Sequence, residues 1–280
     1  MNIIIHRGTH QIGGSVIEIS TASTRIVLDF GNELSLDEKY TSINLDINGV
    51  TKGIPDCDGI VISHYHMDHL GQLTSALPEI PLYMGELSKE IAIISAEYQD
   101  KDLYLRLLGA NTFRGGEAFT IGNIHIRPLV IDHSAADSYM FVIEAEGKRV
   151  LYTGDFRMHG LRHHILEKLV NTYIGEVDVL ITEGTSLSRD ADECISEAAV
   201  LEDISSYIQD GKYVFVMCSS TNIDRIMGIW QNMPTDKVLI CDAYQKKILD
   251  TVINNVYYES SLYRRHDSPL VLNKGPYPKY

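Results

Sequence analysis

The sequence predicts an α/β protein, and three observations carry this prediction. Short apolar stretches separated by glycine and polar turns fill the first thirty residues and the region 118–153, which is typical of β-strands. A further apolar stretch, 58–63, ends in a loop that packs three histidines and an aspartate into six positions. From residue 192, helix-like and strand-like stretches alternate, as they do where helices connect buried parallel strands.

The strands and helices can be placed in chain order from apolar spacing and from glycine and proline breaks. In the first part we expect strands at 2–6, 15–19, 25–30, 58–63, 81–84, 118–121, 123–131, 138–145, 148–153 and 177–182. We expect helices there at 69–77, 86–99, 102–108 and 161–171. In the second part the expected order is helix 193–209, strand 213–218, helix 221–231, strand 237–241 and helix 243–254. This change of pattern predicts two domains, 1–190 and 191–280.

The composition excludes some classes of function. Thirty-eight acidic against 24 basic side chains give a net charge of −14, so the chain has no general attraction for nucleic acid. This argues against a non-specific nucleic-acid coat protein, but not against an enzyme that holds phosphate locally. No apolar run approaches the roughly 20 residues that span a bilayer, so we expect no membrane partner. Four scattered cysteines predict reduced thiols and a cytoplasmic location.

The loop after the apolar stretch 58–63 holds His64, His66, Asp68 and His69. Imidazole and carboxylate groups are costly to bury without partners, and a divalent metal supplies such partners. His64 and His66 are two positions apart, so in an extended loop they point to the same side. Asp68 and His69 come where the chain turns into a helix, so they can face a second metal position.

Three more polar side chains lie at the carboxyl ends of predicted strands, where strands on one sheet edge converge: Asp29, His133 and Asp155. We predict that His133 joins His64 and His66 on one metal. Asp68 and His69 then hold a second metal, and Asp155 bridges the two. Nitrogen and oxygen donors without cysteine favour two Zn²⁺ per chain, with Mn²⁺ as a harder alternative. For Asp29, a turn cap and a residue that orients a ligand histidine both remain open.

These residues resemble the metallo-β-lactamase superfamily and, within it, the ribonuclease J-like β-CASP nucleases. The resemblance rests on residues 63–71, on Asp132-His133-Ser134, on 153–157 and on 181–185. It covers about residues 1–255 and implies an αβ/βα sandwich, an α+β arrangement, followed by a partial β-CASP-like α/β domain. It also implies that Asp132 and Glu183 help to orient the metal ligands without binding the metal themselves.

The resemblance implies a phosphodiesterase that cleaves RNA by endo- or 5′-exonuclease action. In such an enzyme a metal-bound hydroxide attacks the phosphate. Asp68 orients the hydroxide and accepts its proton, and Asp155 bridges the metals, so these two are the predicted catalytic residues. The side chains expected to contact the RNA are Ser134, Arg157, His159 and Arg162. For the last three, a solvated helix start is an equally open interpretation.

The chain departs from the family in one respect. The family has two further motifs that each supply a histidine, whereas the only histidine after His164 is His266, which matches neither motif. We therefore expect a C-terminally incomplete member, whose second metal is weakly held or whose missing elements come from another copy or a complementing chain. Two alternatives to a ribonuclease stay open. One is a hydrolase of thioesters, lactones or small phosphodiesters, and the other is a non-catalytic relative.

Overall fold

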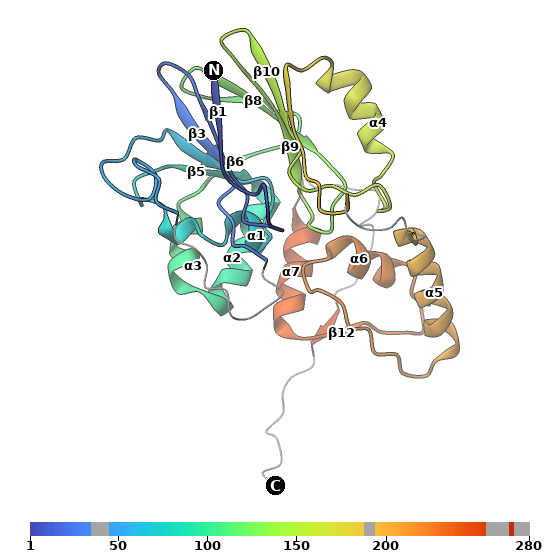
Figure 1. Cartoon of the computed structure of the whole chain (residues 1–280). Coiled ribbons are helices and arrows are strands. Elements are labelled where there is room, and N and C mark those ends of the chain that lie inside the picture. The colour runs from blue at the N-terminus through green and yellow to red at the C-terminus, as the bar shows by residue number, and fades with distance from the viewer. Residues whose placement is uncertain (35–44, 188–193, 256–268, 272–280) are drawn as a thin grey trace.

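Two β-sheets lie face to face, with helices on both outer sides and a third group of helices beneath them (Figure 1). The computed structural model describes residues 1–34, 45–187, 194–255 and 269–271. Apolar side chains from both sheets meet in one buried cluster, for example Ile26 and Leu28 from one sheet and Phe141 and Ile143 from the other. This is the predicted αβ/βα sandwich, and the expected fold class is confirmed.

The first sheet has its strands in chain order, and its parallel half positions the histidine loop. Its strands are β1 (Asn2–Arg7), β2 (Val16–Ser20), β3 (Arg25–Leu28), β4 (Gly59–Val61), β5 (Leu82–Gly85) and β6 (Asn111–Phe113). Strands β1 to β3 pair antiparallel, whereas β3 to β6 pair parallel. Because parallel strands end at the same edge, the residues that follow β3 and β4 lie side by side.

Helices cover the outer face of the first sheet. They are α1 (Met67–Leu70), a 3₁₀ turn (Leu73–Ser75), α2 (Glu86–Gln99) and α3 (Lys101–Leu108). Helix α2 has the predicted bounds, and its apolar face buries Leu87 and Ile91 against the sheet. The carboxylate of Asp100 caps α3 by accepting from two backbone amides. The single helix expected at 69–77 is instead the short α1 followed by the 3₁₀ turn.

The second sheet has the order β11-β10-β9-β8-β7. Its strands are β7 (Phe119–Ile121), β8 (Ile124–Val130), β9 (Tyr139–Ala145), β10 (Lys148–Tyr152) and β11 (Val179–Ile181). Neighbours pair antiparallel except β10 and β11, which are parallel. Helix α4 (Ile165–Leu169), continued by a π-helical turn (Val170–Ile174), covers the outer face, so the helix expected at 161–171 is shorter and displaced.

The third group consists of α5 (Glu197–Asp210), α6 (Ile223–Gln231) and α7 (Ala243–Asn254), with the short parallel pair β12 (Ile240–Cys241) and β13 (Leu270–Val271). Side chains of α7 such as Ile248 and Leu249 are fully buried in the same cluster as α2. Ser196 and Asp242 cap α5 and α7. The two-domain division at residue 190 stays a prediction, and the boundary residues 188–193 lie outside the described chain.

The strand expected at 213–218 is wrong. Within the described chain this segment pairs with no strand, and Phe215 and Met217 are 96% and 100% exposed. A short apolar run forms a strand only where another strand provides hydrogen bonds, and local sequence does not reveal that partner. The strand expected at 237–241 is present only as β12, so in the described chain the parallel strands expected after residue 192 are reduced to the short pair β12–β13. The opposite error is β6, whose polar residues Asn111 and Thr112 concealed its pairing with β5.

No helix in the described part of the chain combines the length and apolar character needed to cross a bilayer.

Candidate metal centre

The strand ends of both sheets meet at one edge of the sandwich. Asp29 follows β3, His64 comes three residues after β4, and both belong to the first sheet. His133 follows β8, and Asp155 follows β10, in the second sheet. These four residues are far apart in the sequence, but the sandwich brings their loops to one place.

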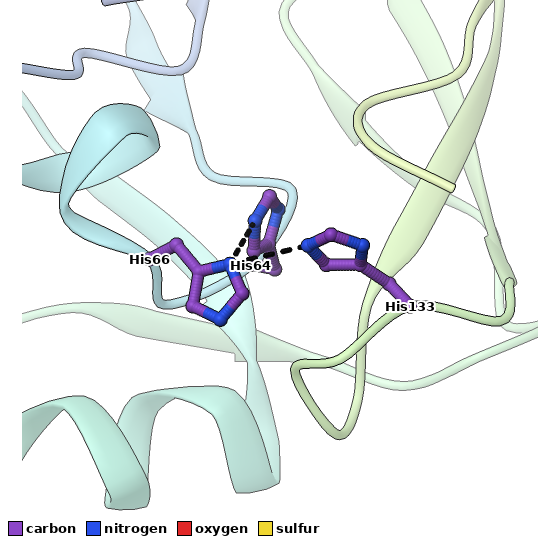
Figure 2. Close-up of side chains that lie close together, drawn as sticks. All are labelled: His64, His66 and His133. Atoms are coloured by element: carbon purple, nitrogen blue, oxygen red, sulfur yellow. Dashed lines mark hydrogen bonds between the residues drawn. The ribbon is translucent and has the colours of Figure 1, made fainter. Parts of the chain in front are cut away.

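Three imidazoles face one another at this edge, and Figure 2 shows His133 approaching the other two from the opposite sheet. Nδ1 of His66 lies 3.1 Å from Nε2 of His64 and 3.1 Å from Nε2 of His133. A tetrahedral zinc ion with Zn–N bonds of about 2.0–2.1 Å holds neighbouring nitrogens about 3.3–3.4 Å apart. These three residues, the first ligand group, therefore have the donor atoms and the spacing that one such ion requires.

Burial keeps the first ligand group neutral. It lowers the pKa of His66 to about 4 and that of His133 to about 3, and it holds the pKa of the fully buried His64 well below its usual value. The neighbouring imidazoles lower these pKa values further, because a second positive charge would be repelled. A metal ligand must present an unprotonated nitrogen, so this group is in the required state at neutral pH.

A second ligand group consists of His64, His69 and Asp155, with one donor atom from each within 4.8 Å of the others. Nε2 of His69 lies 3.2 Å from Oδ1 of Asp155 and 3.6 Å from Oδ2 of Asp68. The other oxygen of Asp155 is 4.0 Å from Nε2 of His133. Asp155 thus lies between the two groups, as a bridging ligand would, whereas Asp68 stands beside the second group and His64 contributes to both.

Negative charge exceeds positive charge around His69. Burial alone would lower the pKa of His69, but the carboxylates of Asp29 and Asp155 outweigh it and raise that pKa well above its ordinary value. Burial raises the pKa of Asp68. Burial would also raise the pKa of Asp155, but the hydrogen bond from His69 and nearby imidazoles bring it below its ordinary value. A buried site that attracts a proton so strongly also attracts a divalent cation, so the residues fit a metal.

Asp29 contacts His69 as a residue that orients a ligand histidine would, and this supporting role stays a prediction. The fully buried carboxylate of Asp29 accepts from Nδ1 of His69 (2.7 Å) and so directs Nε2 of that ring towards Asp155. It also accepts from the backbone and hydroxyl of Ser63 (2.7 and 2.8 Å) and from Oη of Tyr152 (2.5 Å). The backbone of Asp29 adopts a left-handed φ of 57°, which aspartate tolerates better than most residues.

The sequence interpretation missed Ser63 and Tyr152 as members of this site. Ser63 follows an apolar strand, and its hydroxyl also lies 3.0 Å from Nδ1 of His64. Tyr152 belongs to β10 and reaches the site from the other sheet. A serine next to a histidine motif offered a weak signal for the first residue. Nothing local distinguishes Tyr152 from any other inward-facing aromatic residue of a strand.

Helix α1 is held by the backbone rather than by a side-chain cap. The amide of Phe30 donates to the carbonyl of His69 at 2.7 Å, so the chain after β3 lies directly against the helix. A side chain at Gly31 would place its Cβ 1.5 Å from the carbonyl oxygen of Asp68. Only glycine permits this close approach, which sets the orientation of Asp68 and His69 relative to the sheet.

The two other predicted supporting residues act on the loops and not on ligand rings. Glu183 accepts from the backbone amide of Phe156 at 2.7 Å and so fixes the loop just after Asp155. Asp132 is fully buried and accepts from Nε of Arg157 (2.7 Å) and from the amide of Arg162 (2.6 Å). Asp132 therefore anchors the chain immediately before His133 and does not contact the imidazole through a hydrogen bond in the described structure.

The predicted substrate contacts fall into two kinds. Ser134 is half-buried beside His133, and His159 is exposed. The arginines instead have protein partners: Arg157 pairs with Asp132, and Arg162 pairs with the buried Asp224 of α6 at 2.9 Å. Their guanidinium groups hold α6 against the sandwich, which leaves Ser134 and His159 as the better placed of the four predicted contacts.

Replacing Asp29 by asparagine is expected to weaken metal binding at the second ligand group by about 10- to 100-fold, because His69 loses the anion that orients it. Competition between the protein and a chromophoric zinc chelator measures this change. The matched control is Asp58→Asn, an exposed carboxylate that caps the backbone of Arg25 far from the centre. Equal zinc affinity in both variants would contradict the orienting role of Asp29.

A two-sheet αβ/βα sandwich with a histidine and aspartate centre at its edge defines a class of proteins that bind a divalent metal. Residues 24–204 match the model of the β-lactamase superfamily domain, and the chain belongs to this superfamily. Membership implies a divalent metal, for which the two ligand groups provide the donor atoms.

Curated relatives place the chain near RNA-processing enzymes. It is 26% identical to an RNase J-like protein of Methanocaldococcus jannaschii, with 75% of this chain and 49% of the relative covered. It is 25% identical to endoribonuclease YSH1 of Gibberella zeae, covering 92% and 32%, and 24% identical to ribonuclease J of Helicobacter pylori, covering 78% and 33%. The resemblance to the β-CASP ribonuclease branch is confirmed. The chain spans between a third and a half of the length of these relatives.

A solved structure shows the same fold. The crystal structure of a protein of unknown function from Enterococcus faecalis superposes with a TM-score of 0.76 at 19% identity, covering 97% of this chain and 77% of the other.

Proposed function

We propose that this chain carries the hydrolytic centre of a metal-dependent RNA phosphodiesterase of the ribonuclease J kind. The observation that carries the proposal is the pair of adjoining ligand groups, which share His64 and have Asp155 between them. Two Zn²⁺ per chain, RNA as the partner and a cytoplasmic location are parts of this proposal. So is the contribution of further elements by a second copy or a complementing chain.

When bound, the metal would supply a Lewis acid for a phosphoryl oxygen and would lower the pKa of water from about 15.7 towards about 7. The first ligand group would hold one ion through neutral imidazoles. The second would hold the other through His69 and Asp155. Since the whole chain carries a net charge of −14, positive charge for a phosphate must come from such a local source.

Asp68 is the residue placed to move a proton. Its carboxylate stands 3.6 Å from Nε2 of His69 without belonging to either group of three ligands. Burial raises its pKa, which makes the ionised carboxylate a stronger base than an exposed aspartate. Asp155 has the opposite environment, and its lowered pKa keeps it ionised as a ligand. Ser134 and His159, on the neighbouring loops, are the residues proposed to contact phosphate oxygens.

Replacing Asp68 by asparagine is expected to lower the rate of RNA cleavage by about 10²- to 10⁴-fold, because the general base is lost. The measurement is a nuclease assay on RNAs with a 5′-monophosphate or a 5′-triphosphate, in the presence of zinc or manganese. Asp236→Asn, which changes an exposed carboxylate, is the matched control and should cleave as the wild type does. Unchanged rates in Asp68→Asn would assign the activity to a contaminant.

Metal content, measured together with hydrolysis of RNA and of other ester substrates, separates the alternatives. A chain that binds two equivalents of metal and hydrolyses a thioester, lactone or small phosphodiester but not RNA would be a different hydrolase of this superfamily. A chain with one metal or none and no turnover would be a non-catalytic relative. His266, the only histidine after residue 164, lies outside the described residues.

A further inference from the structure

Tyr65 lies between two predicted metal ligands, yet its side chain belongs to the core. It is only 6% exposed and packs in the apolar cluster between the first sheet and its helices. Its hydroxyl accepts a hydrogen bond from the backbone amide of Ala136 at 2.8 Å. The same hydroxyl donates to the backbone carbonyl of Thr221 at 2.7 Å. One phenolic oxygen therefore joins three segments that are distant in the sequence.

Each of these segments bears on the metal centre. The first is the loop with His64 and His66, and the second is the loop 133–136, which begins with His133. The third is the turn 219–222, which leads into α6 and lies beneath the edge of the sandwich (Figure 1). A single antiparallel bridge between Ala135 and Asn222 joins the second and third segments independently of Tyr65. The turn 219–222 is therefore packed against the loop that presents His133.

The hydrogen bond between Tyr65 and Ala136 lies where water cannot replace it. Ala136 is 1% exposed, so its amide would be left without an acceptor if the hydroxyl were removed. The loop 133–136 would then have to shift to satisfy that amide. Because Nε2 of His133 lies only 3.1 Å from Nδ1 of His66, a small shift of this loop changes the spacing of the first ligand group.

We propose that Tyr65 is a positioning residue of the metal centre, whose hydroxyl sets the distance between the loop of His64 and His66 and the loop of His133, and ties both to the turn before α6. The part of the chain after residue 194 then contributes to ligand geometry without supplying a ligand. The involvement of metal rests on the proposed function. The linkage between the three segments does not.

The rival explanation is that Tyr65 is an ordinary core tyrosine whose hydroxyl only adds stability. Tyr244 provides the matched comparison. Its hydroxyl also joins a helix of the third group to the sandwich, by a 2.9 Å hydrogen bond to Oγ of Ser95 on α2. That contact involves no residue of the histidine loops, so Tyr244→Phe removes a hydroxyl that links the same two parts of the chain away from the metal centre.

The experiment compares the wild type, Tyr65→Phe and Tyr244→Phe as full chains. Amide hydrogen exchange of the metal-free proteins is measured at Ala136 and across 219–222. Binding of Co²⁺ is measured from its visible absorption, which reports both affinity and ligand geometry. In Tyr65→Phe, exchange at Ala136 should rise roughly three- to tenfold, the equivalent of one hydrogen bond. Co²⁺ affinity should fall about tenfold, with an altered spectrum. Tyr244→Phe should match the wild type in both.

The inference is overturned if Tyr65→Phe keeps the wild-type exchange at Ala136 and the wild-type cobalt spectrum. It is also overturned if both variants change to the same extent, because that result describes a general loss of stability. If the wild type itself binds no Co²⁺, the proposed function fails, and the hydrogen-exchange comparison at Ala136 still decides whether Tyr65 links the three segments.

Discussion

Replacing His66 by alanine is expected to strip metal from the first ligand group and to abolish hydrolysis of RNA. Nδ1 of His66 is the atom that both other imidazoles approach, at 3.1 Å each, so no remaining donor can take its place. Loss of one of three protein ligands leaves an ion with too few bonds to be retained. Elemental analysis should show one metal equivalent fewer per chain than in the wild type, and the nuclease rate should fall to background.

The control for this prediction is His164→Ala, which removes an exposed imidazole remote from the ligand groups. It should keep both metal and activity, so that a general effect of histidine loss is excluded. Full nuclease activity in a properly folded His66→Ala protein would overturn the metal-hydrolase proposal as a whole.

The second large effect is expected on stability. Replacing Arg157 by methionine should lower the free energy of unfolding by roughly 3–5 kcal/mol, because it leaves the buried carboxylate of Asp132 without its cation. The Arg157 side chain is 9% exposed and lies 2.7 Å from Asp132, 3.5 Å from Glu197 and 3.7 Å from Asp224. Each of these carboxylates is 1% exposed. Urea unfolding measures the change.

Lys52→Met is the matched control, because it makes the same change of charge in an exposed pair. Nζ of Lys52 lies 2.8 Å from Asp46, but the two side chains are 48% and 79% exposed. This pair should contribute less than about 1 kcal/mol, since water screens the charges. If Arg157→Met proved no more destabilising than Lys52→Met, the buried network would not be what holds α5 and α6 against the sandwich.

The ion-pair network around Arg157 lies directly beside the metal centre. Asp132 precedes His133 directly, while Glu197 and Asp224 belong to α5 and α6. Arg225 completes it with a 2.6 Å contact to Glu197. Together with Tyr65, this network attaches the third group of helices at the loop of His133. The exposed segment 213–218 lies in the same group of helices, outside this attachment, and has no pairing strand in the described chain.

Local sequence was sufficient for elements whose pattern needs no distant partner. The bounds of α2 and α7 were predicted correctly from the spacing of their apolar residues. The H-x-H-x-D-H order of residues 64–69 predicted a loop of metal ligands. His64 and His66 point to the same side of an extended loop, and the turn into α1 directs Asp68 and His69 elsewhere. The prediction of a strand at 213–218 also rested on local apolar residues and was wrong, since a strand needs a neighbouring strand to pair with.

The sequence by itself determined which donor atoms the centre has, and their order along the chain: imidazoles and carboxylates at strand ends. Only the tertiary structure decided how they are shared. His64 contributes to both ligand groups, Asp29 contacts His69, and Tyr152 reaches Asp29 from the opposite sheet. It also decided that Arg157 is buried in ion pairs. The physical reason is that donor identity is a property of each residue, whereas distances, burial and charge pairing depend on segments that meet only when the two sheets pack.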